Sequence, residues 1–305
     1  MNEFSFLNVE FIPVGLNHYR ILSEFLKKYP QPLSGYTMAT LTAWNPSYQY
    51  EWAFAEPETL LISYMPDVGT QRQLLQPVGQ VSPKLKHNLI EGAASLPYAL
   101  KFINVSDRFL KKHPEFLKEY SVWEDRSYSN YLYRTDALAR LRGRKYAKKR
   151  NLLSQASSLY TWTCRTLTAG QTDACFEVLD SIEKEEQPVI EGMLAREIAA
   201  LKYTLEHFEE LGQRGLLIFV DDVPVAFSIF EAISPKTVAI HFERALRRFK
   251  GLYQVINLET ARVIAVQGSE YINREEDMGD PGLRDAKSSY HPIKIIPSYE
   301  LKFQK

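Results

Sequence analysis

The spacing of apolar residues in the first part of the chain predicts a mixture of helices and strands. Apolar positions over Ile12–Tyr29 recur every three or four residues, which is typical of an amphipathic helix, and a proline follows at once. Thr59–Met65 and Arg72–Val78 are short apolar runs that are predicted as strands. Ser82-Pro83 combines an N-cap residue with a first-turn proline, so a helix is expected to follow. Further strands are predicted over Lys101–Val105 and Ser127–Arg134.

The second half of the chain repeats this order of elements. Its predicted strands cover Thr161–Leu167, Gly215–Val220, Val223–Ile233, Thr237–Phe242, Glu270–Ile272 and Ile293–Lys302. Its predicted helices are Leu138–Leu159, one from Thr172, Ala195–Leu211, Leu252–Gln267 and one that opens with Asp280-Pro281 and ends before Pro292.

This order of elements predicts an α+β fold class with two domains. Each domain is expected to contain a mostly antiparallel mixed sheet flanked by helices. A boundary near Arg134 divides the chain into residues 1–134 and 135–305, and the helix over Leu138–Leu159 fits either part. The repeat is one of architecture, because no sequence period recurs.

The composition is that of an ordinary globular protein and excludes several classes. The 305 residues include 37 Lys+Arg and 37 Asp+Glu, with 45% hydrophobic and 24% charged residues. Such a chain is neither intrinsically disordered nor collagen-like, and its two cysteines are too few for a disulfide scaffold. No apolar stretch approaches the ~18 residues of a membrane span, and the first residues lack the pattern of a signal peptide. We therefore expect a cytoplasmic protein without a membrane span.

Arg140–Arg150 (RLRGRKYAKKR) is the densest charge feature of the sequence. Seven of its eleven residues are basic and none is acidic, whereas the rest of the second half has seven more acidic than basic residues. At helical spacing Arg144 lies above Lys148 and Lys145 above Lys149, which suits a polyphosphate or the backbone of a tRNA. The alternative is a solvated helix paired with the acidic remainder of this half.

A predicted strand, a basic turn and a helix follow one another over Ala239–Tyr253 (AIHFERALRRFKGLY). Alternation along the strand places His241 and Glu243 on one face, and Glu231 is expected on the neighbouring hairpin strand. A lone histidine here would more often be structural, but the two nearby carboxylates make a catalytic group the stronger hypothesis.

The basic turn of this segment leads into a helix N-terminus. Free backbone N–H groups at such an end can hold an anion. Arg248 and Gly251, in an R-x-x-G pattern, are therefore candidate phosphate-binding residues.

Functional groups are also crowded in Tyr271–Pro292 (YINREEDMGDPGLRDAKSSYHP). The helix that begins at Asp280 would carry Arg284, Lys287 and His291 on one face. The alternative is a capped surface helix that follows a salt-bridged loop. The candidate substrate-binding residues of the segment are Asn273, Glu276, Asp277, Arg284, Lys287, Tyr290 and His291.

The sequence contains no metal-binding or nucleotide-binding motif of a familiar kind. Its six histidines lack HxxxH spacing and its two cysteines lack CxxC spacing. Walker, GxGxxG and GxSxG motifs are also absent. We expect no metal site.

Three strings of the sequence, HFERA…GLYQVIN, YINREEDMGDPGLRDAKSSYHP and LRGRKYAKKRN, resemble an uncharacterised family named after the C-terminal domain of phosphatidylglycerol lysyltransferase. The resemblance covers nearly the whole chain and is strongest toward its end. It implies two tandem folds of the GNAT type, that is, of acyl-CoA N-acyltransferases. The same arrangement occurs in Fem-type peptidyl transferases, which use aminoacyl-tRNA.

The resemblance also bears on the donor of the acyl group. A GNAT turn that holds coenzyme A usually reads Q/R-x-x-G-x-G/A, and Arg248 and Gly251 match it. Tyr253 takes the place of the last small residue and would crowd a pyrophosphate. The first half has a degenerate counterpart, Gln76-x-x-Gly79. No cofactor is implied with certainty, and acyl-CoA and aminoacyl-tRNA both stay open as co-substrates.

The resemblance implies an acyl- or aminoacyl-transferase that moves an activated acyl group onto an amine of an unidentified acceptor, with its active site in the second domain. Glu243 or His241 is expected to take the amine proton, directly or through a water, with Glu231 beside them. Arg248 and the Gly251 backbone would hold phosphate. The residues expected to contact donor or substrate are Lys149, Arg150, Arg284 and Lys287.

Two other hypotheses fit the same residues. The chain could be a catalytically silent GNAT-like module that binds a small ligand or RNA. It could also be a scaffold whose charged patches mediate contacts between copies.

Overall fold

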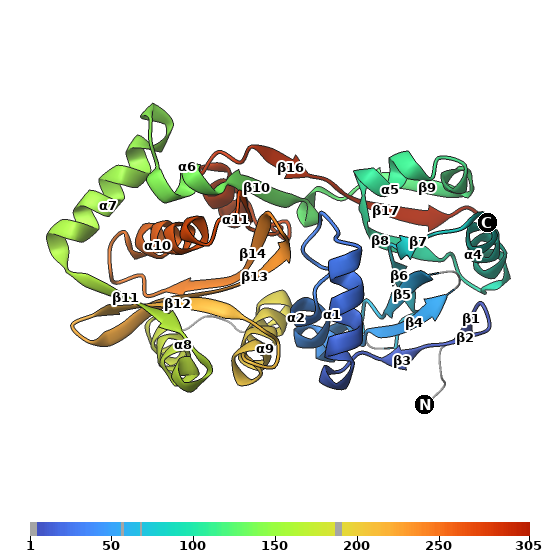
Figure 1. Cartoon of the computed structure of the whole chain (residues 1–305), viewed down its shortest axis with the longest axis horizontal. Helices are drawn as coiled ribbons and strands as arrows, with labels where there is room; N and C mark the ends of the chain where they lie inside the picture. Colours follow the sequence, from blue (N-terminus) through green and yellow to red (C-terminus); the bar gives the residue numbers. More distant parts are fainter. Residues whose placement is uncertain (1–4, 56–57, 68, 187–190) are drawn as a thin grey trace. The chain divides into compact units, whose positions relative to one another are not determined.

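The computed structural model describes residues 5–55, 58–67, 69–186 and 191–305, and it has an α+β fold with two mixed sheets flanked by helices (Figure 1). The chain forms two compact units. The first comprises the residues up to Asn130 with Glu276–Gly279 and Ile296–Lys305, and the second comprises Tyr131–Glu275 and Asp280–Ile295. The predicted fold class is confirmed. No helix in the described part of the chain has the length and apolar character that a membrane crossing requires.

The first unit is built on an eight-stranded sheet in the order β3-β4-β5-β6-β8-β17-β9, with β7 paired to β5. Only β6 and β8 are parallel, and they pair over two residues each. The bounds are β3 Ile12–Pro13, β4 Glu51–Ala55, β5 Glu58–Tyr64, β6 Gln73–Leu75, β7 Val78–Gln80, β8 Lys101–Ser106, β9 Tyr120–Glu124 and β17 Ser298–Phe303. A separate ribbon joins β1 (Ser5–Phe6) and β2 (Val9–Glu10).

The first unit has five α-helices in its described part, and α4 packs its apolar face on the sheet. The five are α1 Tyr19–Lys28, α2 Met38–Ala43, α3 Asn45–Tyr48, α4 Pro83–Ser95 and α5 Asp107–Lys112. As predicted, Ser82 caps α4, since its Oγ accepts a hydrogen bond from the Leu85 N–H at 3.0 Å. Leu85, Leu89 and Ala93 recur every four residues and are buried in one core with strand residues such as Phe102.

The second unit is built on a seven-stranded sheet in the order β11-β12-β13-β14-β15-β10-β16. Neighbours from β11 to β14 are antiparallel, whereas β14 and β15 are parallel. The bounds are β10 Asn130–Arg134, β11 Trp162–Leu167, β12 Arg214–Val220, β13 Val223–Ser234, β14 Thr237–Ala245, β15 Tyr271–Asn273 and β16 Lys294–Ile296.

Helices cover both faces of the second sheet. They are α6 Thr135–Arg140, α7 Ala147–Leu159, α8 Thr172–Glu186, α9 Gly192–Glu206, α10 Leu252–Val266 and α11 Pro281–Ser288. Figure 1 shows α10 on one face of β11–β14, with α7 beside it, and α8 and α9 on the opposite face. Residues of α10 share a buried core with Phe230 and Ile240, so these strand residues mark the face that α10 covers.

The prediction of one continuous helix over Leu138–Leu159 is wrong, because the chain breaks the helix in its middle. α6 ends at Arg140, and Leu141 (φ +47°) and Gly143 (φ +91°) take left-handed conformations before a 3₁₀ turn leads into α7. The Arg150 guanidinium holds this break, because its Nη1 donates to the carbonyl oxygens of Leu141 and Gly143, at 2.7 Å each. Arg144 and Lys148 therefore do not share a row of one helix.

Other elements also differ from the predicted ones. The segment predicted as the helix Ile12–Tyr29 starts with β3, and α1 begins only at Tyr19. The strand predicted over Ile293–Lys302 is divided between the two sheets as β16 and β17, because Pro297 separates them and has no N–H to donate to a ladder. β4 and β9 were not predicted.

The boundaries of the two units differ from the predicted division of the chain at residue 134. The strand β10, assigned by that division to the first domain, lies in the second sheet. The C-terminal strand β17 lies in the first sheet, between β8 and β9. A strand joins whichever sheet edge offers it backbone partners, and sequence order does not determine that edge.

A close contact between α7 and the start of α10 requires a glycine. Gly251 is the N-cap of α10 at φ +83°. A Cβ built there would lie 2.5 Å from the Leu152 carbonyl oxygen and 3.2 Å from the Ala156 Cβ, both on α7. Both the left-handed conformation and the approach of the α7 backbone therefore exclude a side chain.

We predict that Gly251→Ala lowers the free energy of unfolding by about 2 kcal/mol or more, because it combines an unfavourable φ with overpacking. Urea denaturation checks this. The matched control is Gly170→Ala, since a Cβ at Gly170 meets no atom within 4 Å and its φ is ordinary. Equal stability of the two variants would contradict the close packing of α7 on α10.

Candidate active site

The strands β14 and β15 separate in the middle of the second sheet. They pair only over Thr237–Ala239 and Tyr271–Asn273. Beyond that point β14 stays paired with β13 as far as Ala245. The chain after Asn273 instead follows β10, since Arg274 N–H donates to the Tyr131 carbonyl at 2.9 Å. Side chains therefore connect the two strands where backbone hydrogen bonds do not.

A β-bulge in β14 places His241 and Glu243 on opposite faces of the sheet. Ile240 pairs with Phe230, but Phe242 pairs with Ile229, so His241 is the extra residue. Glu243 pairs with Ser228, whose hydroxyl contacts that of Thr260 on α10 at 2.6 Å. Glu243 thus lies on the α10 face, and the prediction that both side chains share one face is wrong.

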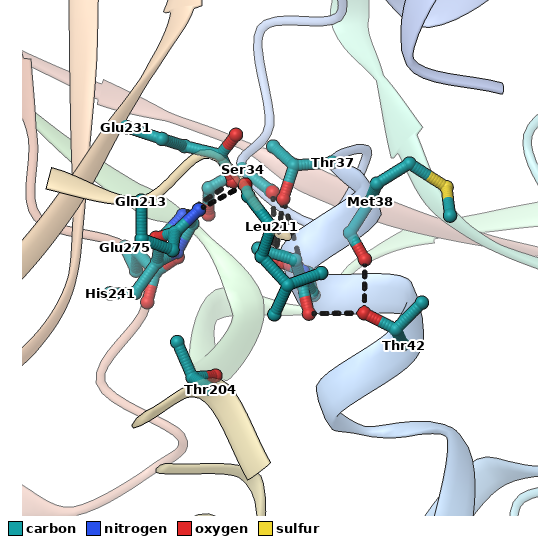
Figure 2. A network of polar contacts seen from close by, with 12 residues as sticks. Ser34, Thr37, Met38, Thr42, Thr204, Leu211, Gln213, Glu231, His241 and Glu275 are labelled. Atoms are coloured by element: carbon teal, nitrogen blue, oxygen red, sulfur yellow. Dashed lines mark hydrogen bonds and ion pairs between the residues drawn. The ribbon is translucent and has the colours of Figure 1, made fainter. Parts of the chain in front are cut away.

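His241 forms a buried cluster with two carboxylates on the face opposite α10. Its Nε2 lies 2.9 Å from Glu231 Oε1 and its Nδ1 lies 2.8 Å from Glu275 Oε1. Figure 2 shows the three side chains grouped together. The His241 side chain is only 5% exposed. Since each ring nitrogen meets an acceptor, both nitrogens must carry a proton to form the two hydrogen bonds.

The charge of His241 follows from its surroundings. Burial alone would lower its pKa, but the charge of Glu275 and the hydrogen bonds to Glu231 and Glu275 together raise it to about 10. His241 is therefore an imidazolium at neutral pH. An imidazolium that donates from both nitrogens has no lone pair with which to accept a proton from a substrate.

Glu243 and Arg274 form the corresponding pair on the α10 face. Arg274 Nη2 donates to Glu243 Oε1 at 2.9 Å, and the side chains are 14% and 10% exposed respectively. The second carboxylate oxygen of Glu243, Oε2, is buried and has no hydrogen-bond partner among the described residues. Leaving a buried acceptor without a partner costs about 1–3 kcal/mol, and Glu51 Oε2 in the first unit is in the same condition beside Arg72.

Arg274 is held by neutral and aromatic groups as well. The Asn257 amide, with its oxygen toward Arg274, accepts from Nη1 at 2.7 Å. The guanidinium carbon lies 5.3 Å from the centre of the Tyr290 ring, and the Lys149 ammonium lies 4.1 Å from the same centre. Burial, with a smaller contribution from Arg274, lowers the pKa of Lys149. Two cations and one carboxylate thus surround Tyr290.

The predicted phosphate turn is engaged within the chain. Arg248 forms an ion pair with Glu185 of α8. The Leu252 N–H at the start of α10 donates to the Phe249 carbonyl at 3.1 Å. Since the backbone of α7 also lies against Gly251, protein atoms occupy the space beside the turn that a pyrophosphate would need. Coenzyme A, held as in a GNAT turn, does not fit these residues.

The residues predicted as one substrate-binding set are divided between the two units. Asn273 is buried in the second unit and accepts the Glu275 N–H at 2.8 Å. Lys287 is buried with its ammonium 5.8 Å from the Tyr131 ring centre. His291 lies beyond the end of α11, and its Nε2 is 3.1 Å from the Lys145 carbonyl. Arg284 lies on α11.

Glu276 and Asp277 belong to the first unit. Asp277 is fully buried, 3.4 Å from Arg126 Nη1, and accepts the Gly279 N–H at 3.0 Å. Glu276 accepts a hydrogen bond from Asn130 at 3.3 Å. These contacts give both carboxylates a structural role in their loop.

The first unit also has a parallel pair of strands, β6 and β8, that separate. Neutral side chains connect the chain there. After Leu75 the strand β6 leaves β8, and Gln76 spans the gap. Its Oε1 accepts from the N–H and hydroxyl of Ser106, at 2.8 and 2.9 Å, and its Nε2 donates to Gln31 at 2.8 Å. All three residues are neutral, so the gap is spanned by hydrogen bonds without an ion pair.

Arg274 and Glu275 are members of this candidate site that sequence reasoning did not select. Their positions could have indicated them. They closely follow a predicted strand, where consecutive side chains point to opposite faces of the sheet, so one charged residue is expected on each face. The first unit also contains a Glu51–Arg72 pair at 2.6 Å that the pattern did not indicate. The described residues include no group of three or more His, Cys, Asp or Glu side chains placed to hold a metal ion.

Comparison with known proteins identifies relatives of the whole chain. The family model described as phosphatidylglycerol lysyltransferase, C-terminal, matches residues 26–302. No curated protein sequence matches. A solved structure of a conserved protein of unknown function from Bacteroides thetaiotaomicron is similar, with 28% identity over 97% of this chain and 100% of that one, and a TM-score of 0.88.

Two more distant structures share the fold. L-PGS from Bacillus licheniformis is 14% identical over 94% of this chain and 91% of its own, with a TM-score of 0.65. FemX is 10% identical over 97% of both chains, with a TM-score of 0.61. The predicted GNAT-like architecture, with two mixed sheets flanked by helices, is confirmed.

We predict that His241→Gln lowers the free energy of unfolding by about 3–5 kcal/mol near neutral pH, because two half-buried carboxylates lose the buried cation between them. The folded pKa of about 10 exceeds the ordinary 6.5, so the stabilisation is complete below pH 6.5 and disappears as the pH rises through 10. Urea denaturation of both proteins across this range measures the difference.

The control for this experiment is His207→Gln, which removes a more exposed histidine paired with Glu210. A deficit for His241→Gln that stays constant from pH 6 to 10 would contradict a protonated ring in the folded protein.

Proposed function

The chain belongs to the family of phosphatidylglycerol lysyltransferase C-terminal domains, and on that premise we propose that it transfers an aminoacyl group from an RNA ester to an amine. The observation that carries this proposal is the partnerless Oε2 of Glu243, beside an oxygen fixed by Arg274. A base of this kind is what aminolysis of an ester requires of its enzyme.

The reaction forms one C–N bond and breaks one C–O bond. The amine nitrogen attacks the ester carbon, and a tetrahedral oxyanion develops on the carbonyl oxygen. Glu243 Oε2 takes a proton from the attacking nitrogen. Collapse of the intermediate returns that proton to the departing ribose hydroxyl, so that Glu243 ends as a carboxylate.

The neighbours of Glu243 support distinct roles. Arg274 fixes the carboxylate through Oε1, while Oε2 makes no hydrogen bond with a described residue. Lys149 and Arg274 place two positive charges at the Tyr290 ring, where they can stabilise the oxyanion or a phosphate of the donor. His241, with Glu231 and Glu275, stabilises the separated strands from the opposite face and positions the Arg274–Glu275 backbone.

An RNA ester is favoured over acyl-CoA as the donor. The turn that would hold a pyrophosphate is closed by α7 and by the Arg248–Glu185 pair. The basic segment Arg140–Arg150 instead offers positive charge suited to a phosphodiester backbone.

An amine is favoured over an alcohol as the acceptor. A neutral amine is itself a good nucleophile and needs only to lose a proton during attack, which one carboxylate can accept. A neutral alcohol is a weaker nucleophile, so its proton must be largely removed as it attacks, and it needs stronger activation. The name of the family refers to phosphatidylglycerol, which carries alcohol groups, so an alcohol belongs among the acceptors tested.

We predict that Glu243→Gln slows the amine-dependent release of an aminoacyl group from aminoacyl-tRNA by about 100-fold or more, since the amide keeps the shape and the Arg274 contact but accepts no proton. Release of radiolabelled amino acid from charged tRNA is followed with a panel of amines and with glycerol as the alcohol. Acetyl-CoA is expected to give no transfer and no calorimetric binding.

The matched control is Glu270→Gln, which removes an exposed carboxylate at the start of β15 that pairs with Lys236. It is expected to leave the rate unchanged. Equal rates for Glu243→Gln and the unmodified chain would refute the assignment of the base. Salt-sensitive binding that does not distinguish charged from uncharged tRNA, without amine-dependent release, would instead identify a silent binding module.

A further inference from the structure

A groove with a volume of about 450 Å³ lies on the α10 face of the second unit, apart from the predicted phosphate turn. Its walls come from the end of α6, from α7, from α10 and from the first residue of β11. Its polar and aromatic lining consists of Arg140, Arg150, Ser154, Ser157, Arg262 and Trp162, and its floor is made by leucines.

Helical spacing explains why these residues meet. Arg150, Ser154 and Ser157 are four and three residues apart and form one stripe along α7. On α10, Arg262 follows Leu258, one of the leucines that line the groove, by one helical turn. The break after α6, which Arg150 itself holds, brings Arg140 to the same place.

The groove carries uncompensated positive charge. Arg140 is exposed and forms no ion pair with a described residue. Arg150 donates to two neutral carbonyl oxygens, which leaves its charge unbalanced. Arg262 meets one carboxylate, that of Glu259, at 2.8 Å. Three guanidinium groups thus face a single carboxylate.

Two features indicate a nucleic acid strand rather than a simple anion. The half-buried Trp162 and the leucine floor offer an apolar surface on which a base can stack, and a phosphate or sulfate ion has no use for either. The basic residues that follow Arg140 continue beyond the groove as exposed side chains, namely Arg142, Arg144, Lys145 and Lys148. They extend the positive charge over more than one phosphate.

We infer that this groove binds a single-stranded RNA segment, with a base against Trp162 and phosphates at Arg140 and Arg262. The identification of that segment as part of the aminoacyl donor rests on the proposed function. Adjacent residues of α7 support the link, since Lys149 reaches Tyr290 in the candidate active site while Arg150 lines the groove.

Fluorescence anisotropy of the full chain with a fluorescein-labelled single-stranded RNA of about 12 nucleotides tests the inference. Arg140→Ala with Arg262→Ala is expected to weaken binding about tenfold or more. The slope of log affinity against log salt is expected to fall by about 1.4, because each of the two phosphates that these arginines neutralise contributes ~0.7. The control is Arg20→Ala with Lys111→Ala, which removes the same charge from exposed positions of the first unit.

Stacking is tested separately at Trp162. Trp162→Ala is expected to weaken binding about fivefold or more, and Trp162→Phe, which keeps an aromatic plane and guards against misfolding, is expected to retain most of the affinity. Inorganic phosphate and a duplex of the same sequence are expected to compete poorly, since neither can place a base on Trp162.

Equal losses of affinity in the two double variants would overturn the inference, because they would show attraction that is independent of the groove. Competition by phosphate or duplex as strong as that of single-stranded RNA would overturn it as well. The transfer assay separates this inference from the proposed function. Transfer that is unchanged in groove variants that have lost RNA binding refutes only the assignment of the bound strand to the aminoacyl donor, whereas groove-dependent binding without any transfer refutes only the enzyme.

Discussion

The second unit depends on charge neutralisation where two parallel strands separate. Beyond Ala239 and Asn273 the backbone no longer joins β14 to β15, and the side chains that fill this place are buried and charged. A charge removed from water must meet an opposite charge nearby, or the fold loses several kcal/mol. Arg274 and Glu275 satisfy this condition on opposite faces of the sheet, each with a partner of opposite charge on β14. The bulge at His241 makes the arrangement possible, because it turns His241 and Glu243 to different faces.

The packing of α7 on α10 has consequences for ligand binding in two places. At Gly251 the α7 backbone comes so close that the turn before α10 is occupied by protein, so coenzyme A does not fit there as it fits in a GNAT enzyme. Residues of the same two helices also line the groove between Arg140 and Trp162. The same helix thus packs against the predicted phosphate turn and lines the groove that we propose binds RNA.

The two units use the same strand arrangement with different chemistry. Both contain one parallel pair that separates after two or three residues. In the first unit Gln76, Ser106 and Gln31 span the gap with neutral hydrogen bonds, which fully satisfy one another. In the second unit an acidic oxygen of Glu243 is left without a partner among the described residues. The first unit also has such an oxygen, Glu51 Oε2 beside Arg72, so the reason to place chemistry in the second unit is the pair of cations, Lys149 and Arg274, that lie at the Tyr290 ring next to Glu243.

The sequence by itself determined the α+β class, most strands and helices, and the caps at Ser82 and Asp280, since these follow from local periodicity and from hydrogen bonds between near neighbours. It also marked Glu243, His241 and the basic segment as unusual. Only the tertiary structure decided that β17 joins the first sheet, that a bulge separates His241 from Glu243, and that Arg150 holds a broken helix. The tertiary structure also decided the protonation state of His241, because its two ring nitrogens each meet a carboxylate, and these carboxylates lie 10 and 34 residues away in the chain. Contacts between distant residues depend on how sheets assemble, and no local pattern encodes that assembly.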